Sequence, residues 1–223
     1  MARGAGASIV GRDARPMMHA EVLPPEQQAC LRQLGPAATA EGFHLIGGTA
    51  VAIHLGHRQS VDFDWCTQQF PGEPVNFAAS LAVRGVRLAT ASLAHGTVHG
   101  SVDGVKVSFL EFKPALLEPT LDWPDYGCRL AGLADLAAMK LLAVSQRGTK
   151  KDFIDVHALG SVMPLEAMID AYCRRFGLTD FGRVLAALCY FDDADHEPMP
   201  TMLVPSDWES IKDAIRGQVR AVA

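Results

Sequence analysis

The hydrophobic and polar positions of the chain follow two different spacings, which meet near Ala131. Before that residue, short apolar runs stop at glycine pairs or polar turns, as strands and short helices do. After it, apolar residues recur at helical spacing in longer stretches such as LADLAAMKLLAVSQRG and KKDFIDVHALG. The pattern predicts an α/β first half and a helical second half.

The first half is expected to begin with a helix from Pro24 to about Glu41, broken or kinked at Gly35-Pro36. Strands are expected over residues 43–46 and 61–65, with a short helix between them that ends at Gly56. The further elements expected before the boundary are a helix over 76–83, strands over 86–93, 96–102 and 105–112, a turn at Asp103-Gly104, a proline-spaced connector over 116–125 and a short strand or loop at CRLAG.

These elements suggest three regions. Residues 1–17 have no periodicity and are rich in glycine, alanine and arginine, so we expect a disordered tail. Residues 18–131 would form the α/β core, and residues 132–223 a helical region that completes the site.

The composition is that of an ordinary globular protein, with 49% hydrophobic and 20% charged residues. No apolar run is long enough to span a membrane, and the N-terminus has no signal-peptide pattern. The 5 cysteines are scattered, which fits reduced thiols in a cytoplasm. The net charge of −5 gives no overall basic surface for nucleic acid, but it does not exclude a local basic patch.

The stretch FHLIGGTAVAIHLGHRQSVDFDW combines two features that phosphate chemistry uses. Gly47 and Gly48 let a backbone approach closely, and the N-terminus of the following helix favours anions, with Thr49 adding a hydroxyl. Asp62 and Asp64 alternate along a strand, so their carboxylates share a face, with Cα atoms roughly 6–7 Å apart. Each feature alone fits an ordinary turn or a solvated strand, but together they predict a phosphate cradle beside a Mg²⁺ site.

This combination of GG[TS] and DxD resembles the signature of DNA polymerase β-type nucleotidyltransferases. The longer string GGTAVAIHLGHRQSVDFD is similar to the AbiEii family, toxins of toxin–antitoxin pairs, and the similarity continues through most of residues 43–160. The resemblance implies an α+β fold: a polymerase β-like nucleotidyltransferase core, with a mixed sheet flanked by helices, and a C-terminal helical lobe. It also implies Mg²⁺ or Mn²⁺ as cofactor and an NTP as substrate.

The second half supplies candidates for the rest of the site. Lys140 lies at the edge of an apolar helix stripe, where it could reach solvent or stabilise a triphosphate. Asp135 lies in the first turn of that helix. The resemblance makes Lys140 the motif lysine and places the last motif aspartate at Asp152 or Asp155. We favour Asp155, as a general base or as a group that orients Lys140 or Arg58.

Several other polar residues are candidates for contacts with phosphate. Arg58 could brace a phosphate or pair with a carboxylate, and Ser60 follows it just before the DxD strand. Arg147 and Lys151 cluster with Lys150 at a helix break, where they could compensate the helix dipole or face nucleotide or RNA phosphates.

A polymerase β-type site often takes a third carboxylate from a neighbouring strand. In VKVSFLEF the inward-facing candidates are Ser108 and Glu111, so a third metal-binding carboxylate is in question. The two main alternatives are therefore a nucleotidyltransferase toxin and a nucleotide-binding module without transfer activity. A metal phosphohydrolase would need more clustered histidine and aspartate ligands than this sequence supplies. The expected partners are an NTP, a tRNA, protein or nucleotide acceptor, and a cognate antitoxin protein, with no membrane.

Overall fold

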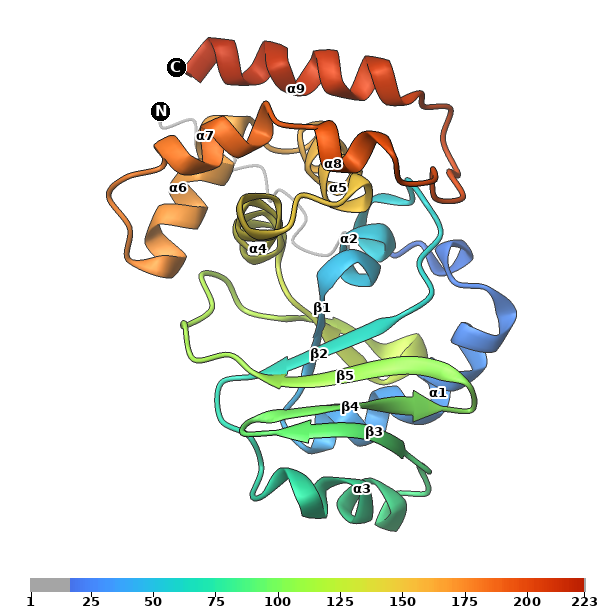
Figure 1. The fold of residues 1–223 in the computed structure, drawn as a ribbon. Coiled ribbons are helices and arrows are strands. Elements are labelled where there is room, and N and C mark those ends of the chain that lie inside the picture. The colour runs from blue at the N-terminus through green and yellow to red at the C-terminus, as the bar shows by residue number, and fades with distance from the viewer. Residues whose placement is uncertain (1–16, 223) are drawn as a thin grey trace, which may run out of the picture.

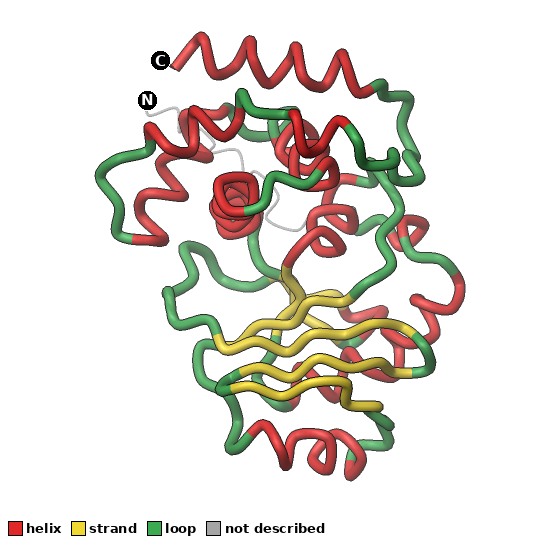
Figure 2. The backbone as a smooth tube through the Cα atoms, in the orientation of Figure 1, coloured by secondary structure: helices red, strands yellow, loops and turns green. Residues whose placement is uncertain are grey.

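The computed structural model describes residues 17–222, so all but Met17 of the tail expected over residues 1–17 lies outside the described residues. Within the described part, the protein is a seven-stranded mixed sheet with helices around it, which confirms the predicted α+β fold. Figures 1 and 2 show the sheet in the lower half of the molecule and the helices of the second half of the chain above it.

The sheet has the strand order β3-β4-β5-β2-β1-β7-β6. Its strands are β1 (His44–Ile46), β2 (Phe63–Thr67), β3 (Ala89–Ala94), β4 (Thr97–Val102), β5 (Val105–Glu111), β6 (Leu121–Trp123) and β7 (Cys128–Leu130). Strands β2 and β5 pair in parallel, as do β1 and β7, while the remaining neighbours are antiparallel. The β4–β5 hairpin turns at Asp103-Gly104, as predicted, with both residues at positive φ.

The helices divide between the two halves of the chain. Those of the first half are η1 (Ala20–Val22), α1 (Pro25–Ala40), α2 (Gly47–Leu55), α3 (Pro74–Val83) and η2 (Pro124–Tyr126). Those of the second half are α4 (Leu133–Gln146), α5 (Lys150–Leu159), α6 (Leu165–Phe176), α7 (Gly182–Leu188), α8 (Asp192–Asp195) and α9 (Trp208–Val222). In the described residues, no helix is long and apolar enough to cross a membrane.

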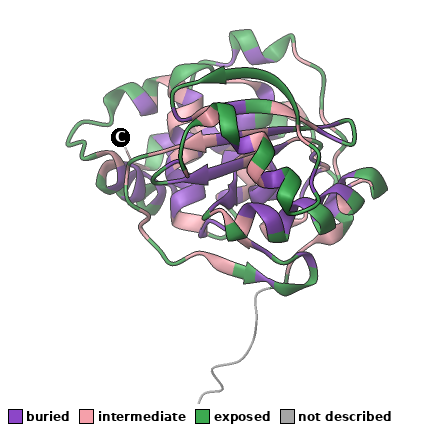
Figure 3. Ribbon diagram, turned by 90° about the horizontal axis from the view of Figure 1, so that it is seen from below, coloured by how far each residue is buried: buried purple, intermediate pink, exposed green. Residues whose placement is uncertain are grey.

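The side chains of β2 alternate between the two faces of the sheet, and this determines which way Asp64 points. Phe63 and Trp65 are fully buried, and Trp65 stacks on Phe109 of β5, which in turn packs edge-on against Phe77 of α3. Because successive side chains point to opposite faces, Asp64 faces away from this aromatic core. Figure 3 shows the buried ribbon concentrated between the sheet and the helices around it.

Of the two alternatives expected at Gly35-Pro36, a break or a kink, the break is wrong, since α1 runs continuously through Pro36. A proline inside a helix costs about 3 kcal/mol. Burial of Leu34, Ala37 and Ala38 around it offsets that cost. Gly35 also has a packing role, because a Cβ there would lie 2.4 Å from the carbonyl oxygen of Tyr126.

The predicted connector over 116–125 is also partly wrong, because its second half contains β6 and the start of η2. Residues 121–123 pair antiparallel with β7. Trp123 is buried and its ring lies 4.2 Å from that of Tyr126. Aromatic packing therefore orders a segment whose prolines suggested a loop.

Two glycine-to-alanine substitutions should change stability in opposite directions. Gly35→Ala would press a Cβ into the Tyr126 carbonyl and should lower the free energy of unfolding by about 1–3 kcal/mol. The matched control Gly217→Ala lies in α9 with nothing within 4 Å of the new Cβ, and should raise it by about 0.5–1 kcal/mol. Urea unfolding of both variants tests this, and a stabilising Gly35→Ala would contradict the packing argument.

Candidate active site

The two aspartates of the DxD motif lie at the start of β2. The strand begins at Phe63, so Asp64 belongs to the sheet ladder, opposite Ile46 and Ser108, whereas Asp62 precedes it. Both residues are half-buried. Burial raises the pKa of Asp64, with a further increase from the charge of Asp62, while the Ser108 hydroxyl and the charge of Lys140 oppose the shift. The two carboxylates and Lys140 are therefore close enough to act on one another.

The glycine pair fits between two charged groups. Gly47 has φ +72°, and a Cβ there would lie 2.7 Å from Oδ2 of Asp64. At Gly48 a Cβ would lie 2.4 Å from Nη2 of Arg58 and 3.3 Å from Oδ2 of Asp155. The pair begins the first turn of α2, so this turn lies close to both the DxD carboxylate and the Arg58–Asp155 ion pair.

Thr49 and Ser60 are buried and bonded to each other, with their hydroxyl oxygens 2.6 Å apart. The Thr49 hydroxyl also donates a hydrogen bond to the main-chain carbonyl of Asp62. The two side chains therefore connect the start of α2 to the segment that carries the DxD motif. In this structure their partners are protein groups that hold Asp62 in place.

Asp155, in the middle of α5, is fully buried, and three side chains bind its carboxylate. Arg58 binds it bidentately, with Nε 2.7 Å from Oδ1 and Nη2 2.8 Å from Oδ2. Nζ of Lys140 lies 2.6 Å from Oδ2, and Nε2 of His57 lies 2.8 Å from Oδ1. This carboxylate thus joins α5 to α4 and to the loop that leads into β2.

Asp152 holds the other end of the same network. Lys140 lies 3.0 Å from its Oδ1, and Arg147 donates to both of its oxygens, at 2.8 Å and 3.1 Å. The Thr149 hydroxyl adds a bond of 2.7 Å. Three cationic side chains, Arg58, Lys140 and Arg147, therefore share the carboxylates of Asp152 and Asp155, which leaves one positive charge in excess.

Burial would by itself raise the pKa of both carboxyls, but the cations outweigh it. Lys140 and Arg58 hold the pKa of Asp155 well below its usual range. The hydrogen bond from Arg147 and the charge of Lys140 lower the pKa of Asp152 to about 2. Burial would likewise lower the pKa of Lys140, but Asp155 and Asp152 raise it above its usual value. The network is therefore fully ionised at neutral pH.

The position of the expected third carboxylate is occupied by Ser108. It pairs in register with Asp64, whereas the carboxylate of Glu111 accepts a hydrogen bond from the main-chain N–H of Phe70. On the next strand, Nδ1 of His99 lies 3.1 Å from the Ser108 hydroxyl. Among residues 17–222, no cluster of three histidine, cysteine, aspartate or glutamate side chains could hold a metal ion.

Asp62 and Asp64 nevertheless fit one hard divalent cation. Mg²⁺ commonly takes one or two protein carboxylates and completes its shell with water and substrate phosphates. The mutual repulsion that contributes to the raised pKa of Asp64 would be relieved by such a cation. With two carboxylates alone, such a cation would need water and substrate phosphate to complete its coordination shell.

Two other predicted residues lie apart from this network. Asp135 is fully buried in an ion pair with Arg175 and accepts main-chain hydrogen bonds from Leu117 and Glu118, so its contacts fix the connector against α4 and α6. Lys151 is exposed at the start of α5. Neither contacts Lys140, Asp152 or Asp155 through any hydrogen bond or ion pair of the described chain.

Sequence reasoning missed two histidines. His57 stands in a polar segment between α2 and β2 with no pattern that marks it, yet it is buried against Asp155. His99 does have a signal, because the alternation of β4 and β5 places it beside Ser108 once the hairpin turn is fixed. No spacing in the sequence signals the His57 contact, because its partner is 98 residues away.

Comparison with known proteins identifies a family and a relative that covers most of the chain. The sequence profile described as nucleotidyl transferase AbiEii toxin, type IV toxin–antitoxin system, matches residues 78–221, a range that begins downstream of the DxD motif. An uncharacterised protein of Aquifex aeolicus (strain VF5) is 32% identical over 202 residues, which cover 87% of this chain and 95% of the relative.

Solved structures share the fold at low sequence identity. JHP933 from Helicobacter pylori superimposes with a TM-score of 0.54 at 15% identity, over 88% of this chain and 89% of that one. MenT4, a nucleotidyltransferase toxin of Mycobacterium tuberculosis, superimposes with a TM-score of 0.52 at 12% identity, over 86% of this chain and 81% of that one. These similarities support the same architecture for the sheet and helices.

The ionised network predicts a specific loss of stability in acid. The pKa of Asp152 is about 2 in the folded chain, against about 3.9 for a free aspartate, so its contribution is complete above about pH 4 and is lost as the pH falls towards 2. Asp152→Asn should remove about 2 kcal/mol of unfolding free energy at pH 7 and flatten the decline between pH 4 and 2.

Urea unfolding at several pH values measures both effects. Asp122→Asn, at an exposed carboxylate of β6 with no ion-pair partner in the described part of the chain, is the control and should keep the wild-type profile. An Asp152→Asn variant with the wild-type slope in acid would contradict the assignment.

Proposed function

The chain belongs to the AbiEii family of nucleotidyltransferase toxins, and we propose that it transfers a nucleoside monophosphate from an NTP to an RNA, protein or nucleotide acceptor in a reaction that depends on Mg²⁺ or Mn²⁺. In this reaction an acceptor hydroxyl releases its proton to solvent, and its oxygen forms a bond to the α-phosphorus. The bond from that phosphorus to the bridging oxygen breaks, and pyrophosphate leaves with the electron pair.

One observation carries the proposal. The first turn of α2 contacts Asp64 through Gly47, and the Arg58–Asp155 pair through Gly48. A carboxylate that we assign to the metal and a cluster with excess positive charge therefore both adjoin one glycine turn, where a metal-bound triphosphate could contact them together.

Asp62 and Asp64 are the residues that we assign to the metal. A bound Mg²⁺ would supply positive charge for the phosphate oxygens and polarise the α-phosphate. Thr49 and Ser60 support the metal site by holding the main chain of Asp62, through the hydrogen bonds described above. The main-chain N–H groups of Gly47 and Gly48 remain our candidates for direct phosphate contact.

Lys140 and Arg147 are the groups that we assign to the leaving phosphates. The ammonium of Lys140 uses two of its three donors on Asp152 and Asp155, so one N–H remains for a phosphate oxygen. Arg147 has a side chain that is 64% exposed, so its guanidinium can meet a triphosphate from the solvent side. Lys151 is exposed near the same helix start, where it can contact an acceptor.

We assign Asp155 an orienting role. Its carboxylate is fully buried and engaged by Arg58, Lys140 and His57, so it has no free approach for an acceptor hydroxyl. Its ionised state holds Lys140 charged and fixes the guanidinium of Arg58. Asp152 acts in the same way on Lys140 and Arg147.

The biological setting that we propose follows from the family. As a toxin of a toxin–antitoxin pair, the chain would act in the cytoplasm and be opposed by an antitoxin protein encoded beside it. A tRNA is one acceptor to test, because the exposed cations Arg147 and Lys151 could meet its phosphates.

The competing function is a nucleotide-binding module without transfer activity. Ser108 at the third-carboxylate position is the observation that favours it, because a hydroxyl is a poorer Mg²⁺ ligand than a carboxylate. The ionised Lys140 network favours transfer, since a regulatory module needs affinity but no stabilisation of a leaving group.

Nucleotide binding should depend on the two motif aspartates. Asp62→Ala and Asp64→Asn should each abolish Mg²⁺-dependent binding of ATP, CTP, GTP or UTP while the protein stays folded, because each removes a proposed metal ligand. Isothermal titration measures the affinity and circular dichroism the fold. Asp122→Asn serves as the control, and unchanged affinity in both motif variants would refute the metal assignment.

Transfer should depend on the two phosphate-facing cations. Wild-type protein, incubated with NTPs radiolabelled at the α-phosphate and with total bacterial RNA or lysate, should label a discrete species. Lys140→Met should slow labelling on the order of 10²–10³-fold, the cost of losing one preorganised charge. Arg147→Gln is the second variant, because its exposed side chain makes a folding defect smaller.

Lys106→Met, at an exposed position of β5, is the control and should label as wild type does. Equal labelling by wild type, Lys140→Met and Arg147→Gln would exclude both cations from the mechanism. Nucleotide binding by wild type with no labelled product for any of the four NTPs would support the module without transfer activity.

A further inference from the structure

A row of polar side chains crosses the sheet beside the DxD motif. In the strand register, Asp64 of β2 pairs with Ser108 of β5, and Ser108 pairs with His99 of β4. Paired residues point to the same face, so all three lie on the face away from the buried rings of Trp65 and Phe109. Neighbouring strands lie about 4.8 Å apart, which places the main chain of His99 about 10 Å from that of Asp64. His99 is exposed on this face, and Ser108 is half-buried.

Hydrogen bonds along this row determine which nitrogen of His99 carries a proton. The Ser108 hydroxyl opposes the rise in the pKa of Asp64, as a hydroxyl does when it donates to a carboxylate. With its proton directed at Asp64, the Ser108 oxygen is an acceptor for Nδ1 of His99, which lies 3.1 Å away. Nδ1 therefore carries the proton of the neutral ring, and Nε2 keeps an unprotonated lone pair.

The position assigned to the phosphates determines the side from which an acceptor comes. Towards β1, Asp64 pairs with Ile46, the residue directly before the glycine turn, and towards β5 it pairs with Ser108. Figure 1 shows α2 on one side of β2, and β5 and β4 on the other. In phosphoryl transfer the attacking and leaving oxygens lie roughly in line, on opposite sides of the phosphorus. Because the leaving phosphates are assigned to the side of α2 and Lys140, the acceptor hydroxyl approaches over β5 and β4.

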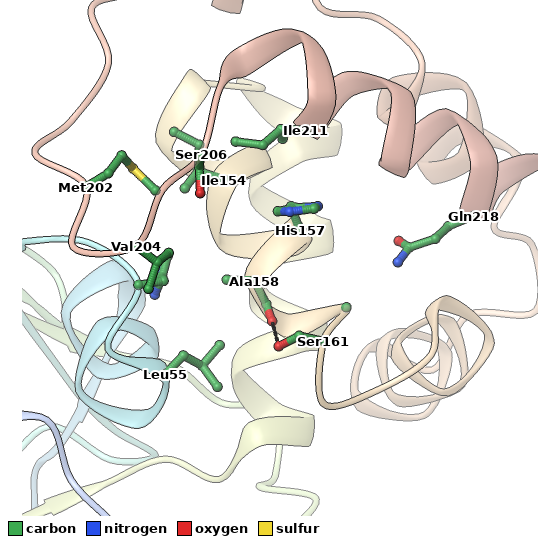
Figure 4. A pocket seen from close by; sticks show the side chains of 12 residues that line it. Leu55, Ile154, His157, Ala158, Ser161, Met202, Val204, Ser206, Ile211 and Gln218 are labelled. Carbon is green, nitrogen blue, oxygen red and sulfur yellow. Dashed lines mark hydrogen bonds between the residues drawn. The ribbon is translucent and has the colours of Figure 1, made fainter.

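A cavity of about 330 Å³ beside α5 and α9 does not offer this approach. Figure 4 shows Leu55, Ile154 and Ile211 in its wall. None of the described residues that line it is an aspartate, glutamate, lysine or arginine, and none belongs to β2, β4 or β5. A phosphate held at Asp64 is therefore reached over the sheet and not through this cavity.

We propose that His99 is the catalytic residue that takes the proton of the acceptor hydroxyl, and that Ser108 is a positioning residue that orients its ring. The acceptor O–H bond breaks as its oxygen bonds to the α-phosphorus, and the proton passes to Nε2 of His99. The bond from the α-phosphorus to the bridging oxygen breaks, and pyrophosphate leaves with the electron pair. The imidazolium then releases its proton to the solvent around the exposed ring.

This role rests on the proposed transfer reaction, and it explains how the site works with Ser108 in place of a carboxylate. A serine hydroxyl takes up no proton near neutral pH, whereas an imidazole does. The acceptor side of the site therefore has a base, which the next strand of the sheet presents beside Ser108.

The orientation of the ring can be measured without any substrate. Two-dimensional ¹H–¹⁵N spectra of the ring nitrogens, recorded on the full chain at about pH 8.5, where an ordinary histidine is neutral, should show His99 protonated at Nδ1 and unprotonated at Nε2. His99→Ala identifies these signals by removing them, and Ser108→Ala should shift the ring towards the Nε2–H form. His95→Ala, at an exposed histidine between β3 and β4, is the control and should leave them unchanged. A wild-type ring protonated at Nε2 would overturn the proposal.

Transfer should depend on the lone pair of His99. His99→Asn keeps an N–H donor near the position of Nδ1 but offers no base, so it should slow labelling from NTPs radiolabelled at the α-phosphate about 10²-fold, the lower end for a general base. Its affinity for NTP and Mg²⁺ should equal that of wild type, because His99 lies outside the proposed phosphate and metal groups. The position is exposed, so the variant should fold. His95→Ala should label as wild type does.

Added imidazole distinguishes a lost base from a lost structural contact. In His99→Ala it can occupy the space of the missing exposed ring, and it should raise labelling about tenfold or more there but not in wild type. Wild-type labelling by His99→Asn, a loss of its NTP affinity, or no rescue of His99→Ala would overturn the proposal. If wild type binds NTP but labels nothing, the proposed function fails and this role with it. If wild type and His99→Asn label equally, this role alone fails.

Discussion

The carboxylate of Asp155 is the group on which the arrangement of this site depends. It has no contact with solvent, and Arg58, Lys140 and His57 bind its two oxygens from two other parts of the chain. A buried charge of this kind is tolerated only when its partners are in place. Folding of the helical region onto the sheet and assembly of the cationic cluster are therefore one event, because either without the other would leave buried charges unpaired.

Much of the fold follows from local sequence patterns. The alternation of β2, the Asp103-Gly104 turn and the glycine at position 56 each act over a few residues, so spacing alone identifies them. The errors arise where packing overrides local preference. Pro36 stays inside α1, where Gly35 packs against Tyr126, a residue remote in sequence. The strand Leu121–Trp123 forms through contacts with Tyr126 and Cys128, only a few residues further along the chain.

The residues of the candidate site also fall into two groups, those that local spacing identifies and those whose contacts depend on the tertiary structure. The GG and DxD motifs can be recognised from their spacing, since Gly47 and Asp64 lie on consecutive elements of the chain and come close together. The contact between His57 and Asp155 spans 98 residues and could not, because no local pattern marks a histidine whose partner lies on another helix. The sequence also left Thr49 and Ser60 without a defined partner, and only the tertiary structure shows that their hydroxyls bond to each other.

The two glycines at the start of α2 have a consequence for how relatives of this protein are judged. A Cβ at either would displace a charged protein group, at Gly47 the Asp64 carboxylate and at Gly48 the Arg58 guanidinium, and Gly47 also has a positive φ. The folded chain therefore favours both glycines even when no nucleotide is present. A descendant that had lost transfer activity would still carry the pair as long as it kept this ion pair and this carboxylate. The glycine signature identifies the architecture, and activity has to be judged from the charges around it.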